Sequence, residues 1–407
     1  MPQLISIPSN KEFSASLSSI PAAVEALRPE VDAYITTERV RRYLSRIADT
    51  PAPSTAAGAF RVPVLRALMR EDGVLNMPGL ILREDFENTG SPVVITGTPE
   101  TAKKLWYFAH LDTISYLVLQ QVEDFYPLVP FCYHLMSNGV RPARAYRYSL
   151  ARNHYALFAE GELHSVDGRP SFRPHVGAAV IRPGDRIVPY APYREDLQSG
   201  NFVGQMDNAG GVVALVVAAP VLARAGVEAL LAMPDEEEGP QGSGSQVMGR
   251  GGSRIISLLP PPDIAIIADV QQAGDYQDFN THVGDANSTR LGHGAVLAEF
   301  SSLARGAVTP PHLYALAKQF GEAMAKVGVS VQESNNAYTS RSDDVSVLLK
   351  TPNILLLGFP GLNRHFDLGA PRANLHDIVD LAKALVYYSA ILPVYNELRL
   401  GLSGAYS

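Results

Sequence analysis

The sequence predicts an α/β protein with a mainly parallel or mixed central sheet, flanking helices and an inserted small β-rich domain. Short apolar runs typical of buried strands alternate with helical patterns over most of the 407 residues. In the middle of the chain, short aromatic or β-branched runs are instead separated by Pro and Gly. The chain is too long for one ordinary core. We therefore expect a discontinuous α/β domain, residues 1–118 and 203–407, around an insert at residues 119–202.

Two helices and one strand are predicted before the insert. Apolar positions at helical spacing indicate helices over Glu38–Ile47 and Val62–Met69, separated by a proline-rich break at Pro51. The run Leu105–Ala109 is typical of a buried strand, and His110 follows it directly.

Helices and strands alternate again after the insert. The Ala/Val-rich segment Asn208–Gly226 predicts a buried helix with Gly226 as its C-cap. Asn374 is a possible N-cap of the last clear helix. The other predicted elements are a helix over His312–Gly328 and strands at Val227–Met233, Ile264–Ala268 and Ile354–Leu357.

Composition limits the possible partners. The net charge of -7 argues against a general nucleic-acid surface. No stretch approaches ~18 uninterrupted apolar residues, which argues against a membrane span, and no signal peptide is evident, so we expect a cytoplasmic protein. The single cysteine, Cys132, excludes an intrachain disulfide and a multi-cysteine zinc site. The Gly-rich stretch Gly239–Gly252 does not fit the phosphate-binding pattern, and we predict no organic cofactor site.

Five short segments carry a His or a carboxylate next to an apolar run, where open α/β sheets bind ligands. His110 and Asp112 are two residues apart, so on an extended chain one could ligate a metal while the other orients an imidazole. Asp207 and Asn208 stand at a helix start, where either is a possible N-cap, while Asp207 could also be a carboxylate that bridges two cations. Asp269 follows an apolar run and is either a turn residue or a ligand, and His365 follows a strand-exit loop.

The acidic run Asp235–Glu238 is the most telling of these segments. Four adjacent carboxylates after an apolar strand repel one another and would normally form a solvated loop. Cations at the strand end would remove that penalty. A two-metal hydrolase needs one carboxylate as ligand and a free one as general base, and such a run supplies both. All candidate ligands are His, Asp or Glu, which suit zinc, with cobalt or manganese also possible.

The order of these motifs resembles that of the glutamyl and tetrahedral aminopeptidases, a family of co-catalytic di-zinc metallopeptidases with an inserted β-domain. The matching segments are Ala109–Asp112, Asp207–Gly211, Glu236–Gly242, Asp269-Val270 and Gly358-Phe359-Pro360 followed by His365. The resemblance implies that His110, Glu237, Asp269 and His365 ligate two metal ions, with Asp207 bridging them. It further implies that Glu236 is the general base and that Asp112 orients a ligand imidazole. The register of the acidic run is open by one residue, and Asp367 is a rival of His365 as ligand.

The sequence therefore favours a metal-dependent aminopeptidase that removes N-terminal residues from peptides by means of two metal ions and an activated water. A homo-oligomer is expected. The nearest alternative is a di-metal carboxypeptidase or N-acyl amino acid deacylase, for which Arg290, Arg341 or Arg364 could bind a substrate carboxylate. A non-catalytic binding or scaffold protein with the same fold is a second alternative. A metal-independent glycosidase that uses two of the carboxylates is a third.

Overall fold

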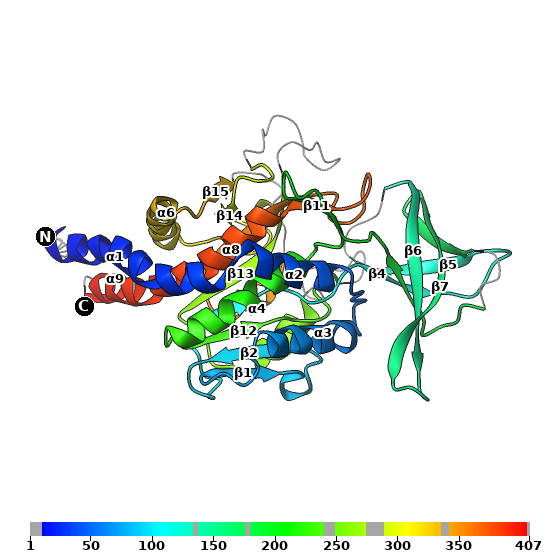
Figure 1. The fold of residues 1–407 in the computed structure, drawn as a ribbon, viewed down its shortest axis with the longest axis horizontal. Coiled ribbons are helices and arrows are strands. Elements are labelled where there is room, and N and C mark those ends of the chain that lie inside the picture. Colours follow the sequence, from blue (N-terminus) through cyan, green and yellow to red (C-terminus); the bar gives the residue numbers. More distant parts are fainter. Residues whose placement is uncertain are drawn as a thin grey trace, which may run out of the picture.

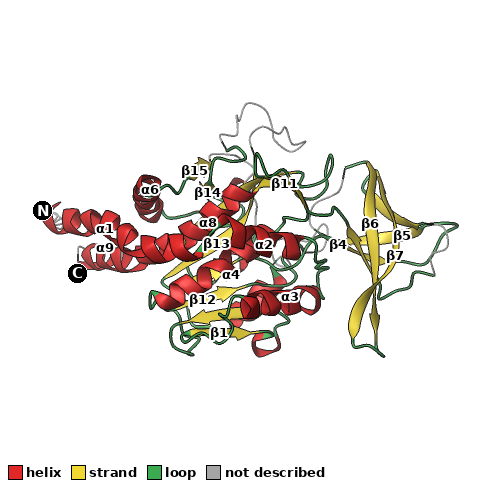
Figure 2. Cartoon of the chain, in the orientation of Figure 1, coloured by secondary structure: helices red, strands yellow, loops and turns green. Residues whose placement is uncertain are grey.

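The computed structural model describes residues 10–132, 137–175, 180–239, 249–273, 289–334 and 342–404. Most of the predicted loop Gly239–Gly252, and Arg341, lie outside these residues. The chain forms an α/β part and a β-barrel, which lie at opposite ends of the view in Figure 1. Helices surround the sheet of the α/β part, whereas the barrel consists of strands and loops (Figure 2). The predicted fold class, a flanked central sheet with a small β-rich unit, is confirmed.

Three helices precede the sheet. The predicted helices are present as α2 (Thr37–Ala48) and α3 (Ala57–Glu71), the latter longer than expected by more than one turn. The preceding helix α1 (Asn10–Tyr34) was not predicted, and it contains Pro21 and Pro29. Its apolar residues Ile20, Val24 and Val31 are buried in the core.

The central sheet is mixed, with a parallel centre. Strand β3 (Leu105–Phe108) lies between β12 (Ala229–Ala232) and β13 (Ile264–Gln272), and β13 pairs in turn with β16 (Ile354–Leu362), all in parallel. Antiparallel strands extend it on both sides. These are β1 (Leu80–Arg83), β2 (Val93–Thr96), β10 (Arg194–Glu195), β11 (Asn201–Val203), β14 (Ala295–Ala298) and β17 (Arg372–Asn374), while β15 (Val331–Ser334) pairs in parallel with β14.

The two faces of the parallel centre belong to two apolar clusters, because successive side chains of a strand point to opposite sides. In β3, Leu105 and Tyr107 join the larger cluster, whereas Trp106 and Phe108 join the smaller one. The larger cluster holds α1, α2, α4 (Ala209–Arg224), α6 (Pro311–Lys326), α8 (Leu375–Tyr387) and α9 (Ile391–Gly404). The smaller one holds α5 (Arg250–Ser257) and α7 (Asp344–Val347).

Two predicted helix caps are confirmed. The Asn208 side chain accepts a hydrogen bond from Gly211 N at the start of α4, and Asn374 accepts one from His376 N at the start of α8. The segment Leu375–Glu397 is apolar and long enough to cross a membrane, but 72% of its most apolar window is buried inside the protein. It therefore has the character of a core element.

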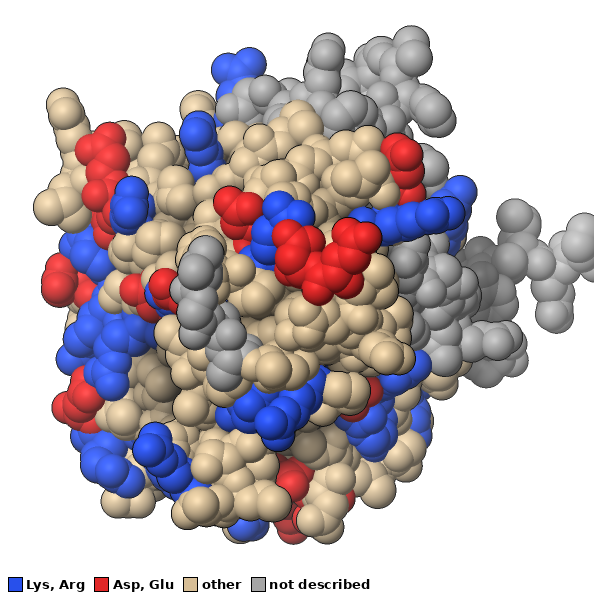
Figure 3. Space-filling model, turned by 90° about the vertical axis from the view of Figure 1, so that its right-hand side faces the viewer, with Lys and Arg blue, Asp and Glu red and all other residues tan. Residues whose placement is uncertain are grey.

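The barrel is closed in the order β4-β5-β8-β7-β6-β9. Its strands run from β4 (Ser115–Val118) to β9 (Arg186–Pro189), through β5 (Tyr126–Phe131), β6 (Gly139–Ser149), β7 (His154–Val166) and β8 (Arg169–Pro174). Because β10 and β11 already belong to the central sheet, we propose that the inserted unit is this barrel rather than the whole of residues 119–202. Figure 3 views the barrel end, where acidic and basic side chains are interspersed.

Candidate metal centre

The predicted ligands converge at the carboxyl ends of the four parallel strands. His110 follows β3, the acidic run follows β12, Asp269 lies within β13 and His365 follows β16. The predicted strand Ile264–Ala268 was too short by four residues, because β13 continues to Gln272. Asp207 joins them just before α4. This is the edge at which open α/β sheets bind ligands.

Three buried groups meet at one point of this edge. His110 Nε2 lies 3.1 Å from Asp207 Oδ1 and 3.5 Å from Asp269 Oδ1. One atom from each of these residues lies within 4.8 Å of the others, a spacing that could hold a metal ion.

A second group shares Asp207 with the first. His365 Nε2 lies 3.2 Å from Asp207 Oδ2 and 3.4 Å from Glu238 Oε2, and these three residues also form a cluster that could hold an ion. The two oxygens of Asp207 thus face different imidazoles. The rival residue Asp367 belongs to neither cluster, and its backbone carbonyl accepts a hydrogen bond from Arg141 Nη2 at 2.5 Å.

The acidic run divides into residues that face the centre and residues that do not. Glu237 is buried with Oε2 3.7 Å from His110 Nε2, and its Oε1 has no hydrogen-bond donor among the residues that the structure describes. Glu236 adopts a positive φ of 64° and pairs instead with Arg254 Nη2 at 2.7 Å and with Arg250. Asp235 accepts backbone N–H groups from Thr55, just before α3, and from Ala57, the first residue of α3. Glu237 and Glu238 are therefore the carboxylates of the run that meet the two imidazoles.

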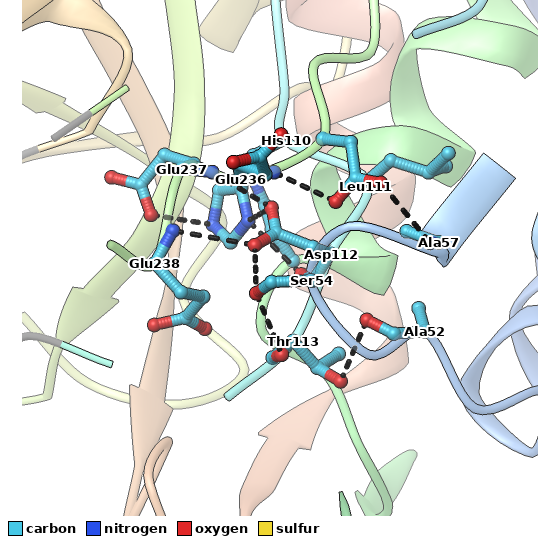
Figure 4. Close-up of polar contacts among 12 residues, drawn as sticks. Ala52, Ser54, Ala57, His110, Leu111, Asp112, Thr113, Glu236, Glu237 and Glu238 are labelled. Carbon is cyan, nitrogen blue, oxygen red and sulfur yellow. Dashed lines mark hydrogen bonds and ion pairs between the residues drawn. The ribbon is translucent and has the colours of Figure 1, made fainter. Parts of the chain in front are cut away.

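Asp112 links the loop after β3, in which it lies, to the acidic run after β12 (Figure 4). Its Oδ1 accepts the backbone N–H of Glu237 at 3.0 Å, and its Oδ2 accepts that of Glu238 at 3.4 Å. His110 Nδ1 lies 3.1 Å from the Asp112 carbonyl oxygen and 3.6 Å from its carboxylate. Asp112 thus lies beside the ring edge of His110 that faces away from Asp207.

Burial and mutual charge shift the acidities of these groups. Burial lowers the pKa of His110, but Glu237 and Asp269 together with other carboxylates outweigh this effect and raise that pKa well above its ordinary range. Burial raises the pKa of Glu237 well above its ordinary value and raises that of Glu238. Burial also acts on Asp207, but the two imidazoles lower its pKa.

The residues present fit a pair of divalent ions. Imidazole nitrogens and carboxylate oxygens are the ligands that zinc, cobalt and manganese take in proteins. Glu237 Oε1 and Glu238 Oε1 are buried and receive no hydrogen bond from the described part of the chain, which is costly for a carboxylate unless a cation compensates.

Several residues beside this centre were missed by the sequence analysis. Arg61, Ser54 and Asp343 are fully or almost fully buried. Arg61 Nη1 donates to the Leu111 carbonyl at 2.6 Å, and within the described ranges neither carboxylate oxygen of Asp343 has a hydrogen-bond donor. Burial raises the pKa of Asp343 to about 8. Each residue lies in a segment with no strand-end pattern, so the sequence carried no signal for it.

Comparisons with known proteins agree with this geometry. The fold and the buried His and carboxylate cluster define a hydrolase of the peptidase class. The family model "Peptidase family M20/M25/M40" matches residues 180–391, just over half of the chain. The chain belongs to this family, which confirms the prediction of a hydrolase that acts on peptides. No curated protein matches the chain.

Solved structures with a similar fold include three archaeal peptidases. An aminopeptidase from Desulfurococcus kamchatkensis has a TM-score of 0.65 and 17% identity, over 86% of this chain and 94% of that one. The TET aminopeptidase from a marine sediment Thaumarchaeota archaeon has a TM-score of 0.63 and 15% identity, over 86% of this chain and 95% of that one. The TET1 peptidase of Pyrococcus horikoshii has a TM-score of 0.61 and 16% identity, over 86% and 99%. The predicted resemblance to tetrahedral aminopeptidases is thus confirmed at the level of the fold.

Proposed function

We propose that this protein is a two-metal aminopeptidase. The observation that carries the proposal is the position of Asp207, whose two oxygens face His110 and His365 at 3.1 and 3.2 Å. In this assignment His110 and Asp269 hold one ion, Glu238 and His365 hold the other, and Asp207 holds both. Divalent ions here would supply Lewis-acid chemistry, lowering the pKa of water and polarising a carbonyl. Zinc is the ion we expect first.

We assign the general base to Glu237 rather than to Glu236. Glu237 is buried beside His110, and one of its oxygens has no donor among the described residues, so it can accept a proton from water and pass it to the leaving amine. The Glu236 carboxylate instead forms an ion pair with Arg254 of α5. The assignment places the acidic run one residue later than the sequence motif implies, with Glu238 in place of Glu237 as ligand.

The aminopeptidase activity and the assembly are proposed from the similar structures. Two of the three peptidases named above are aminopeptidases, and the Pyrococcus horikoshii TET1 peptidase can assemble into a tetrahedron or a large octahedral shell. We propose that this chain, too, removes N-terminal residues from peptides and forms a cytoplasmic homo-oligomer. Light scattering of the purified chain measures the assembly directly.

The deciding experiment measures metal content together with hydrolysis of an aminoacyl-anilide panel before and after chelation. We expect close to two ions per chain and release of the anilide that chelation abolishes and zinc restores. Bound ions with activity only on N-acylated or C-terminal substrates would replace the proposal by a deacylase or carboxypeptidase. Chelator-resistant hydrolysis of a glycoside would favour the glycosidase. A chain that binds no ion even after reconstitution would overturn the proposal.

A further inference from the structure

The segment between α2 and α3 connects the two strand-end loops of the centre. Ala52 and Ser54 contact the loop after β3, where the Ala52 carbonyl accepts the backbone N–H of Thr113 at 2.8 Å. Further along, Thr55 N and Ala57 N donate to the Asp235 carboxylate of the acidic run at 3.0 and 3.2 Å. The same segment therefore contacts both the acidic run and the loop after β3, where Figure 4 shows Ser54 beside Asp112.

Within this segment, the Ser54 hydroxyl is aimed at Asp112. Ser54 is 1% exposed, and its Oγ donates to Asp112 Oδ2 at 2.5 Å. This distance is that of a charge-assisted hydroxyl–carboxylate hydrogen bond, which is stronger than a bond between neutral groups. Asp112 is 0% exposed, so water does not replace a lost donor at this carboxylate.

Asp112 transmits this contact to the groups that we assign to the metal centre. Its carboxylate accepts the backbone N–H groups of Glu237 and Glu238, and it lies 3.6 Å from His110 Nδ1. A rotation of this carboxylate would therefore displace Glu237, the assigned general base, or the ligands His110 and Glu238, which belong to different ion sites. The Ser54 hydroxyl thus holds a carboxylate that contacts three residues of the centre.

The backbone around Ser54 is held by contacts that do not involve the serine hydroxyl. The backbone on its N-terminal side pairs with Thr113, and the backbone on its C-terminal side donates to Asp235. In α3, which follows the segment, Arg61 Nη1 donates to the Leu111 carbonyl at 2.6 Å. Because these contacts fix the backbone around Ser54, its hydroxyl is preorganised toward Asp112, which is the arrangement that supports a functional site best.

We propose that Ser54 is a positioning residue of the metal centre, which orients Asp112 and through it His110, Glu237 and Glu238. The inference rests on the proposed two-metal function. It gives the segment between α2 and α3 a role in the chemistry, although none of its residues belongs to the proposed ligand set.

The test is zinc affinity of the whole chain, measured by competition with a chromophoric chelator, for Ser54→Ala and Ser54→Cys. Removing a residue that orients a metal ligand, as Asp112 orients His110, weakens metal binding by about 10- to 100-fold, and a loss of up to this size follows when Asp112 itself loses the donor that holds it. We expect that loss for Ser54→Ala, a smaller one for Ser54→Cys because a thiol is a weaker donor, and recovery in Ser54→Thr. The catalytic constant for an aminoacyl-anilide should fall with the affinity, whereas KM changes little.

Thr113→Val is the matched control. Thr113 Oγ1 donates to the Ala52 carbonyl at 3.3 Å, so this variant removes a neighbouring buried hydroxyl without touching Asp112. We expect it to keep wild-type zinc affinity. Ser54→Cys keeps nearly the size of serine, so it tests the inference even if Ser54→Ala does not fold. Zinc affinity of folded Ser54→Cys or Ser54→Ala equal to wild type, or an equal loss in Thr113→Val, would overturn the inference alone. A wild-type chain that binds no ion would overturn the proposed function with it.

Discussion

Arg141 of the barrel donates from Nε to the backbone carbonyl of Phe366 at 2.8 Å. Phe366 directly follows His365, and Arg141 is only 6% exposed although it lies on barrel strand β6. Its Nη2 also donates to the Asp367 carbonyl at 2.5 Å. The barrel therefore holds the loop that carries one imidazole of the candidate centre, so the two parts of the chain are mechanically connected at this point.

Replacing Arg141 with Met should loosen that loop. The change leaves the Phe366 carbonyl without its donor in a buried setting, which costs about 1–3 kcal/mol of unfolding free energy. Zinc at the His365 position should bind more weakly, while the ion held by His110 is less affected. A stepwise zinc titration with urea unfolding measures both effects.

Arg144→Met is the control for Arg141, because Arg144 lies on the same strand and pairs with Glu160 at the barrel surface. Its cost should be about 1 kcal/mol or less. Equal zinc affinities in the two variants would contradict the link between the barrel and His365.

Glu237→Gln and Glu236→Gln should differ strongly in activity. A positioned general base contributes about 10²- to 10⁴-fold to rate, and we expect a loss of that size for Glu237→Gln with both ions retained. Glu236→Gln weakens an ion pair with Arg254 at the edge of the centre, and its rate should fall much less. Steady-state kinetics with metal analysis distinguishes the two registers of the acidic run. The reverse ranking would restore Glu236 as the base.

Metal binding should expel protons and weaken as pH falls. The surrounding carboxylates raise the pKa of His110 and of His365 well above the ordinary value, so the metal-free imidazoles are protonated at neutral pH. An imidazole ligates only after it loses that proton. Calorimetric zinc titrations in buffers of different ionisation enthalpy should reveal net proton release. Zinc affinity that does not depend on pH between 6 and 8 would contradict the charge state inferred here.

Asp377 gives a pH dependence that is independent of the centre. Burial raises its pKa from 3.8 to about 7, against the hydrogen bonds that its carboxylate accepts from Gly292 N and Gly294 N. Between these values the folded chain binds a proton that the unfolded chain does not, so Asp377 lowers stability as pH rises from about 4 to 7. The cost of Asp377→Asn should therefore shrink with rising pH in urea unfolding at pH 5 to 8.

Asp32→Asn provides the comparison for Asp377. Asp32 pairs with Lys383, which lowers the pKa of Asp32. The stabilising contribution of this carboxylate is therefore lost only as the pH falls below the ordinary aspartate pKa of 3.8. The effect of this substitution should stay flat over pH 5 to 8. A parallel trend in both variants would assign the pH dependence to another group.

The parts of the site that follow a strong apolar strand were predictable. His110 and His365 could be located because the sheet brings parallel strand ends to one edge, and buried strands leave a clear apolar run. The register of the acidic run could not be predicted, because four adjacent carboxylates look alike in sequence. Their difference comes from the positive φ of Glu236 and from arginines on α5, which is a distant contact.

Helix α1 and Ser54 were missed for related reasons. The pattern of α1 is interrupted by Pro21 and Pro29, and it gains its apolar partners from α6, α8 and α9 far along the chain. Ser54 lies in a short loop whose importance depends on Asp112, a residue of another segment. Such tertiary contacts are not encoded in local periodicity.

The central position of β3 has a consequence for synthesis of the chain on the ribosome. Both parallel neighbours of β3, β12 and β13, are made only after the entire barrel. Until then the four apolar residues Leu105–Phe108 have two unpaired edges, which is a hazard for aggregation. The barrel strands pair with one another and so can form during this delay. The nascent chain therefore carries β3, which His110 directly follows in the loop, without either parallel neighbour until residues well beyond the barrel have been made.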